Sequence, residues 1–143
     1  MIMAKSVCLD TGPLVAWLSR NDHYHSWAKQ ELFRLDSPAI TCESVLSEAF
    51  FLLKNHPMAI DAVHGMMNDG LISVKPVFSE PDNNDVLFRM QKYSFIPGSF
   101  ADLCLVYLYE TRKDCHILTL DRDFLHFRDR SGRHLKLIAP FDL

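Results

Sequence analysis

The chain has 143 residues, a hydrophobic share of 48%, a charged share of 23% and a formal net charge of −3. These values indicate a soluble globular protein with a full core, and the negative charge argues against gross nonspecific attraction to nucleic acid. No apolar run is long enough to cross a membrane, and residues 1–5 do not begin a signal peptide, so we expect a cytoplasmic protein. The four cysteines stand singly, without a C-x-x-C pair, so we expect neither a zinc site nor a disulfide framework.

Strand and helix signals alternate along the first half of the chain. In chain order we expect a strand at 6–10, a helix from Pro13, a helix at 26–35, a strand at 38–41, a helix at 42–55, a helix at 59–68 and a strand at 71–74. Proline suits the first turn of a helix, where its missing N–H would be unpaired anyway. In the helix at 42–55 the apolar residues share one face, and Glu48 lies at the border of that face.

The second half continues the alternation. We expect a helix at 81–93, a helix at 99–112, a strand at 116–120, a short helix at 124–127 and a last strand at 135–139. The helix at 99–112 is apolar nearly all round, which is typical of a buried helix. Alternating elements favour an α/β domain with a mainly parallel sheet of four to five strands. The chain shows no linker, so residues 1–143 are expected to form one domain.

Two carboxylates follow expected strands directly. Asp10 ends the first strand, and Asp121 ends the strand at 116–120, with Asp123 close behind. Ligands of open α/β sheets bind outside the carboxyl ends of the strands, so both positions favour a binding site. The alternative for Asp10 is an N-cap of the helix near Pro13, at about even odds, and Asp121 or Asp123 could cap the short helix in the same way.

Two further carboxylates lie on expected helices. Glu48 could be an ordinary surface residue, but its place beside the apolar face favours a function, whereas the helix dipole accounts for Glu43. Asp102 lies three residues after Ser99, as in a capping box. It also opens the apolar helix, where a carboxylate would be poorly solvated unless it is paired or binds a metal.

Carboxylates gathered at one edge of a sheet repel each other unless a cation neutralises them. An oxygen-only set suits Mg²⁺ or Mn²⁺, and such ions serve phosphoryl chemistry by activating water and stabilising the leaving oxygen. A phosphodiester is the natural substrate of that arrangement.

These residues resemble the motifs of PIN domains, particularly the VapC-type toxin ribonucleases, over most of the chain. The matching stretches are Leu9-Asp10-Thr11, Ser44-x-x-x-Glu48, Ala101-Asp102 and Thr119-x-Asp121-x-Asp123-Phe124. The resemblance implies a three-layer α/β/α fold and Mg²⁺- or Mn²⁺-dependent cleavage of RNA. Gly12-Pro13 departs from the more usual polar residue after the first Asp and hydroxyl residue, a variation that we regard as tolerable.

The resemblance also assigns roles to individual residues. It implies the catalytic residues Asp10, Glu48, Asp102 and Asp121, and the metal ligands Asp10, Asp102, Asp121 and Asp123. Thr11 and Thr119 match hydroxyl residues that support such a site. Arg122, between two of the acids, is a candidate contact for the RNA backbone.

The resemblance further implies a cognate antitoxin protein and a homodimer. The segment from 58 to 93 could offer an apolar partner surface, although each of its apolar residues is about twice as often ordinary core. The residues in question are Met58, Met66, Met67, Phe88 and Met90.

Two other functions are considered. A phosphatase of the haloacid-dehalogenase type also places an Asp after its first strand, but it needs a second Asp where this chain has Gly12. A non-catalytic RNA- or partner-binding module of the PIN fold would have no reason to keep the full acidic set, and metal titration would separate it from the nuclease.

Overall fold

The structure is a computed structural model that describes residues 6–78, 84–96, 98 and 100–141. Its strands form one sheet in the order β3-β2-β1-β4-β5, and all four pairings are parallel. The strands are β1 (Ser6–Leu9), β2 (Ala39–Cys42), β3 (Ile72–Lys75), β4 (Cys115–Leu118) and β5 (Leu137–Ile138). The predicted parallel sheet is therefore confirmed.

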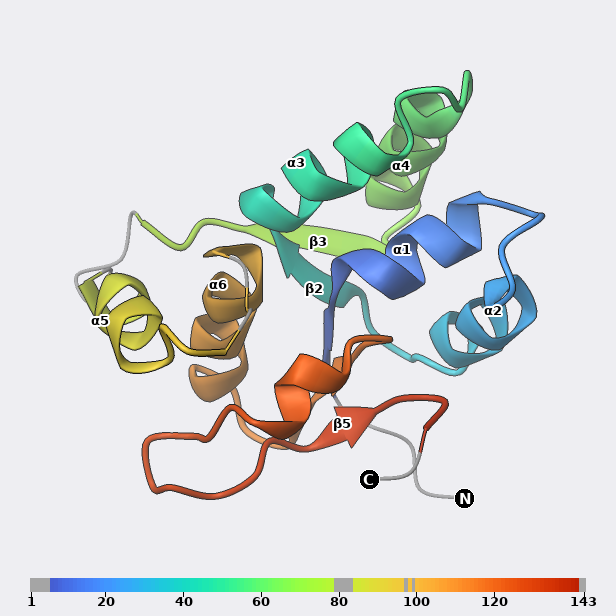
Figure 1. Cartoon of the computed structure of the whole chain (residues 1–143). Coiled ribbons are helices and arrows are strands. Elements are labelled where there is room, and N and C mark those ends of the chain that lie inside the picture. Colours follow the sequence, from blue (N-terminus) through green and yellow to red (C-terminus); the bar gives the residue numbers. More distant parts are fainter. Residues whose placement is uncertain (1–5, 79–83, 97, 99, 142–143) are drawn as a thin grey trace.

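Helices cover both faces of the sheet, with α5 and α6 on one side and α1 and α2 on the other (Figure 1). The helices are α1 (Thr11–Leu18), α2 (His25–Phe33), α3 (Glu43–Leu52), α4 (Ala59–Asn68), α5 (Asn84–Lys92), α6 (Phe100–Glu110) and the 3₁₀-helix η1 (Arg122–Leu125). This arrangement confirms the predicted three-layer α/β/α fold. Residues 81–83 and 99, which were expected to begin two of the helices, lie outside the described residues.

Most predicted elements have slightly different limits in the structure, and three of the differences have a clear local description. The helix expected to reach 112 ends at Glu110, because the N–H and the hydroxyl of Thr111 both bond the carbonyl of Leu108. The expected helix at 124–127 is a 3₁₀ turn that begins at Arg122, where the side chain of Asp121 caps it. The last strand pairs with β4 over two residues only, although Leu135 is buried in the core.

The strand order places a topological switch point between β1 and β4. From β1 the chain adds β2 and then β3 on one side, whereas β4 and β5 extend the sheet on the other. At such a point the connections leave the sheet in opposite directions and open a crevice outside the carboxyl ends of the two strands. The strand order therefore favours a binding site at the carboxyl ends of β1 and β4.

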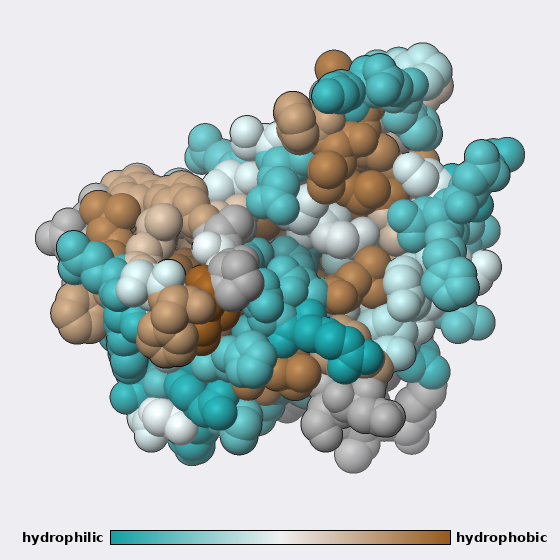
Figure 2. Space-filling view, in the orientation of Figure 1, coloured by the Kyte–Doolittle hydropathy of each residue, from teal (hydrophilic) through white to brown (hydrophobic). Residues whose placement is uncertain are grey.

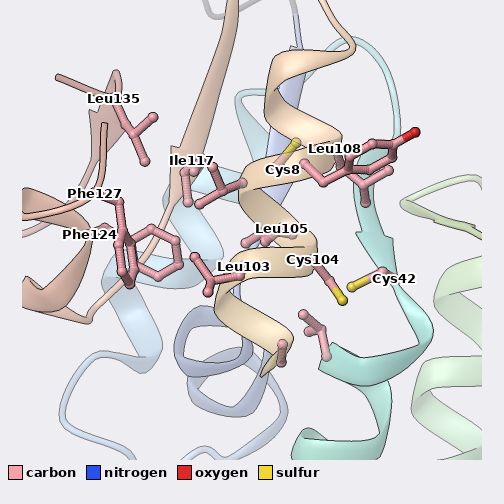
Figure 3. Packing of buried hydrophobic residues seen from close by; sticks show 14 of the residues in the cluster. Cys8, Cys42, Leu103, Cys104, Leu105, Leu108, Ile117, Phe124, Phe127 and Leu135 are labelled. Atoms are coloured by element: carbon pink, nitrogen blue, oxygen red, sulfur yellow. The ribbon is translucent and has the colours of Figure 1, made fainter. Parts of the chain in front are cut away.

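Helix α6 is the centre of one of the two hydrophobic clusters. Every residue from 101 to 108 is buried, as the all-round apolar pattern predicted. The helix packs on β1, β2 and β4 and on the helices α3 and α5. Phe124 and Phe127 meet edge to face with ring centroids 5.5 Å apart, beside Leu103 of α6 (Figure 3).

The described helices are all short, and none combines the length and the apolar character needed to span a membrane.

Candidate functional site

Asp10 lies at the carboxyl end of β1, next to the end of β4. Leu9 pairs with Leu118, and the backbone N–H of Asp10 donates to the carbonyl of Leu118 at 3.0 Å. Asp10 is 4% exposed and stands at the N-cap position of α1, but its side chain makes no cap hydrogen bond. One carboxylate oxygen instead accepts from the hydroxyl of Thr119 at 2.7 Å. The N-cap alternative for the Asp10 side chain is therefore wrong.

Thr119 links Asp10 to the acids that follow β4. Its hydroxyl oxygen also accepts a hydrogen bond from the backbone N–H of Asp121 at 2.9 Å. The side chain of Asp121 accepts in turn from the N–H of Asp123 at 2.8 Å and so caps η1. Asp121 therefore has a capping function, and it lies close enough to the end of β1 for its charge to act on Asp10.

Asp102 reaches the same edge from α6. This helix precedes β4 and packs against it, and Asp102 lies in its first turn, 6% exposed. Its charge acts on Asp10, as does the charge of Asp121. Three of the four predicted catalytic acids are therefore close enough to interact electrostatically.

Burial and these neighbouring charges change the protonation of the site. Burial, above all, raises the pKa of Asp10 from 3.8 to about 7, and the charges of Asp102 and Asp121 add to the rise, while the hydrogen bond from Thr119 opposes it. Burial and the charge of Asp121 also raise the pKa of Asp123. These carboxyl groups therefore hold their protons more readily than usual, and a nearby positive charge would favour their ionised forms.

Glu48 is placed less centrally. It lies in the second turn of α3, which contacts both α1 and α6, and it is half-buried. Its side chain makes no hydrogen bond or ion pair with the described residues. The role predicted for Glu48 stays a prediction.

The oxygen donors at this edge suit a hard cation. Beside Asp10, the buried hydroxyl of Thr11 has no hydrogen-bond partner among the described residues, so one more oxygen is available to a bound group. Within the same residues, no three His, Cys, Asp or Glu side chains are arranged to hold one ion. The donor chemistry therefore fits Mg²⁺ or Mn²⁺, and the acids would have to move closer together to bind it.

The other residues predicted near the site differ in their surroundings. Arg122 is exposed, and its guanidinium lies over the ring of Phe141, 4.5 Å from the centroid.

Gly12, where the chain departs from the usual pattern, is explained by packing. A Cβ at Gly12 would lie 3.1 Å from the Cβ of Leu120, the residue between Thr119 and Asp121. A side chain at position 12 would push against the turn that carries Asp121.

Thr41 is a residue that sequence reasoning missed. It lies on β2, is fully buried, and donates its hydroxyl hydrogen to the carbonyl of Leu9 at 2.9 Å. This bond ties β2 to β1 one residue before Asp10. A hydroxyl residue inside an apolar strand, directly before α3, was the available signal.

Surface character agrees with this placement of the site. Hydrophilic side chains occupy the middle of the face in view, between brown regions over α5 and over α3 and α4 (Figure 2). The exposed large hydrophobic residues of these elements include Phe51, Leu52, Met58, Ile60, Met67, Leu87 and Phe88.

Comparison with known proteins identifies the family. Residues 7–129 match the model of the PIN domain. Among solved structures, the chain is similar to the VapC20 toxin of Mycobacterium tuberculosis, described as cleaving the sarcin–ricin loop, with a TM-score of 0.71 and 20% identity over 82% of this chain and 92% of that one. At this identity the likeness establishes the fold, and no curated protein matches the sequence. Because the family match spans the acids after β1 and β4 and the helix between them, the chain belongs to the PIN domain family.

Proposed function

We propose that this PIN domain is a metal-dependent endoribonuclease of the VapC toxin type, which hydrolyses phosphodiester bonds of RNA. The observation that carries the proposal is the buried Asp10 at the switch point of the sheet, on which the charges of Asp102 and Asp121 both act. Thr119 is hydrogen-bonded to the side chain of Asp10 and to the backbone of Asp121. PIN family membership and the fold shared with a ribonuclease toxin support it.

The acids would hold the cation, and the chain around them would orient the acids. In the proposal Asp10, Asp102, Asp121 and Asp123 are the ligands, and Mg²⁺ or Mn²⁺ supplies Lewis acidity toward the scissile phosphate and acidifies water. Thr119 fixes one oxygen of Asp10, so the carboxylate keeps its orientation. Glu48, half-buried on α3, is proposed to accept a proton from the attacking water.

The proposed substrate is RNA, and the proposed protein partners are an antitoxin and a second copy of the chain. The VapC20 toxin is described as cleaving a structured RNA loop, which suggests the same class of substrate here. The apolar surface considered from the sequence is present only in part. Met58, Met67 and Phe88 are exposed, whereas Met66 is buried and Met90 packs against the core.

The alternative is a binding module that keeps the fold without cleaving RNA. The observation that favours it is that no three of the described acids are arranged to hold one metal ion. Calorimetric titration with Mn²⁺ separates the two functions, because a pure binding module has no reason to bind the ion.

The decisive experiment compares variants that keep the size of the side chain. We expect the purified protein to cleave RNA with Mg²⁺ or Mn²⁺ and to lose cleavage in EDTA. Asp10→Asn and Asp102→Asn should each lower the rate at least a hundredfold, because they remove charge that would balance the cation.

Two residues of α3 provide a matched comparison. Glu48→Gln should lower cleavage, whereas Glu43→Gln, an exposed acid in the first turn of the same helix, should leave it unchanged. Cleavage at the wild-type rate by both Asp10→Asn and Asp102→Asn would contradict the proposed nuclease.

The proposed homodimer is tested separately, by measuring the mass of the purified protein in solution by sedimentation equilibrium.

A further inference from the structure

Two cysteines that the proposed function does not use lie close together on neighbouring strands of the sheet. Cys8 is on β1 and Cys115 begins β4, and the parallel register pairs Ser6 with Cys115, so both cysteines point to the same face. Their sulfur atoms are 3.3 Å apart, and both are free thiols. A disulfide requires about 2.05 Å between the sulfur atoms. Because the register places Cys8 and Cys115 on a diagonal between neighbouring strands, the bond also requires a shift of the β1 and β4 backbones toward each other.

One of the two thiols lines a pocket. Cys115 is 3% exposed, yet it lines a pocket of about 360 Å³ at the amino end of β4, together with Arg112 and Lys136. Cys8 is fully buried behind it and does not line this pocket. A small reagent that enters the pocket therefore meets Cys115 first.

The surroundings of Cys115 favour the thiolate. The hydrogen bond from Cys8 lowers the pKa of Cys115 to about 7 despite burial, and Ser6 and the positive charge of Arg112 contribute to the lowering. The Nε of Arg112 is buried and has no hydrogen-bond partner among the described residues. A thiolate beside a guanidinium, at the floor of an open pocket, is the environment in which cysteines react with oxidants.

We propose that Cys8 and Cys115 form an oxidisable dithiol, in which a hydroperoxide reacts with Cys115 and Cys8 then closes an intramolecular disulfide between β1 and β4. In the first step the Cys115 thiolate attacks one peroxide oxygen, giving the sulfenic acid and releasing hydroxide, or alkoxide from an organic hydroperoxide. In the second step the Cys8 sulfur attacks the sulfenic sulfur, a disulfide forms and water leaves. Two thiols are oxidised to one disulfide while one peroxide is reduced, and an external thiol reverses the reaction by exchange.

The test uses the full chain and hydrogen peroxide. Thiols are counted in denaturant after treatment, and the cross-linked peptides are identified by mass spectrometry without reduction. We expect the four thiols of the reduced chain to fall to two, with Cys8 joined to Cys115. Four remaining thiols, a sulfinic acid on Cys115, or disulfides between chains would each overturn the proposal.

The second cysteine pair provides a matched control. The sulfur atoms of Cys42 and Cys104 also face each other, from β2 and α6 (Figure 3). A chain carrying Cys42→Ser and Cys104→Ser should still lose both of its remaining thiols to hydrogen peroxide. If the wild-type chain joins Cys42 to Cys104 instead, the pocket and Arg112 do not select the reactive thiol.

Single variants test the order of the two steps. In Cys8→Ser the sulfenic acid of Cys115 has no thiol to close on, so dimedone should capture it at that position. In Arg112→Gln the loss of thiols should be several-fold slower than in the wild type. Dimedone labelling of another cysteine in Cys8→Ser, or an unchanged rate in Arg112→Gln, would contradict the assigned roles, and the thiol count of the wild-type chain decides even if a variant fails to fold.

Discussion

At the residue scale, the environment of Asp10 disfavours an isolated negative charge. The side chain is 4% exposed, it accepts a hydrogen bond from the hydroxyl of Thr119, and the charges of Asp102 and Asp121 act on it. Of these acids, Asp121 has an ordinary structural role as a helix cap, whereas the side chain of Asp10 caps no helix. Ionising all of them together is unfavourable without a positive charge, and the proposed cation would supply that charge.

The raised pKa of Asp10 predicts how stability depends on pH in the presence of EDTA. The folded chain holds a proton on Asp10 up to about pH 7, whereas the unfolded chain releases it near pH 3.8. Stability from this group is therefore full below about pH 4 and is lost as the pH rises to about 7, by at most roughly 4 kcal/mol at about 1.4 kcal/mol per pKa unit.

Denaturant unfolding of the wild type and Asp10→Asn across this range measures the effect. The difference in the free energy of unfolding between the two proteins should change in favour of the variant as the pH rises. Mg²⁺ should raise the stability of the wild type near pH 7 and leave Asp10→Asn unaffected. Parallel pH profiles for the two proteins would contradict the burial of an unneutralised carboxylate.

Thr119 is predicted to support the site through its hydroxyl group. Thr119→Val keeps the shape but removes the donor to Asp10 and the acceptor for the N–H of Asp121. We expect a loss of about 1–3 kcal/mol in the free energy of unfolding and a lower rate of RNA cleavage. Thr119→Ser, which keeps the hydroxyl, should retain most of both. Equal values for the Val and Ser variants would show that the hydroxyl is unimportant.

At the element scale, α6 positions Asp102, and Gly98, shortly before this helix, lies very close to the ring of Phe127. A Cβ at Gly98, two residues before α6, would lie 2.6 Å from the Cζ of Phe127. Phe127 is 1% exposed and packs edge to face on both Tyr93 and Phe124, so its ring has little space to move. The absence of a side chain at Gly98 therefore allows its backbone to lie against this aromatic cluster.

Substitution of two glycines separates this packing effect from the general effect of adding a methyl group. Gly98→Ala should lower the free energy of unfolding by about 1–3 kcal/mol through overpacking against Phe127. Gly65→Ala, in the interior of α4 with no atom within 4 Å of the added Cβ, should raise it by about 0.5–1 kcal/mol. Thermal unfolding measures both, and a stabilised Gly98→Ala would contradict the close approach.

At the scale of the whole molecule, a buried ion network joins α5, α6 and the loop before β5. Arg89 is 6% exposed and bonds Asp85 at 3.0 Å, the carboxylate of Glu110 and the carbonyl of Arg128. Glu110 also accepts from the backbone N–H of Arg130 at 2.7 Å. One cation, Arg89, therefore holds α5 and the loop before β5 against the end of α6, the helix that carries Asp102 at its other end.

Removal of this cation should destabilise the chain strongly. Arg89→Met leaves the Glu110 side chain, 9% exposed, with only the exposed Arg130 to balance it, so we expect a loss of about 3–5 kcal/mol. Glu110→Gln in the same chain should recover part of this loss. Arg34→Met, which breaks an exposed pair with Glu31, should cost less than about 1 kcal/mol. If the changes in the free energy of unfolding caused by Arg89→Met and Glu110→Gln simply add in the double variant, the two side chains are not directly coupled.

Local pattern was sufficient for much of this molecule. The order of strands and helices, the burial of α6 and the acids after β1 and β4 follow from periodicity and from turn residues, which act over a few positions. Asp102 was correctly expected to be buried because its neighbours are apolar all round the helix. The single domain at 1–143 and the roles of all the predicted site residues stay predictions, and these residues are Asp10, Thr11, Glu48, Asp102, Thr119, Asp121, Arg122 and Asp123.

Long-range contacts decided the rest. The hydroxyl of Thr119 meets Asp10 across 109 residues, and the sulfur of Cys8 meets that of Cys115 across 107. The need for glycine at position 98 depends on Phe127, and the buried carboxylate of Glu110 depends on Arg89 for its ion pair. Sequence alone determined which elements form and which acids stand at their ends, because those are local properties of the chain. The strand order decided which of these side chains meet, because pairing β1 with β4 is a property of the folded sheet alone.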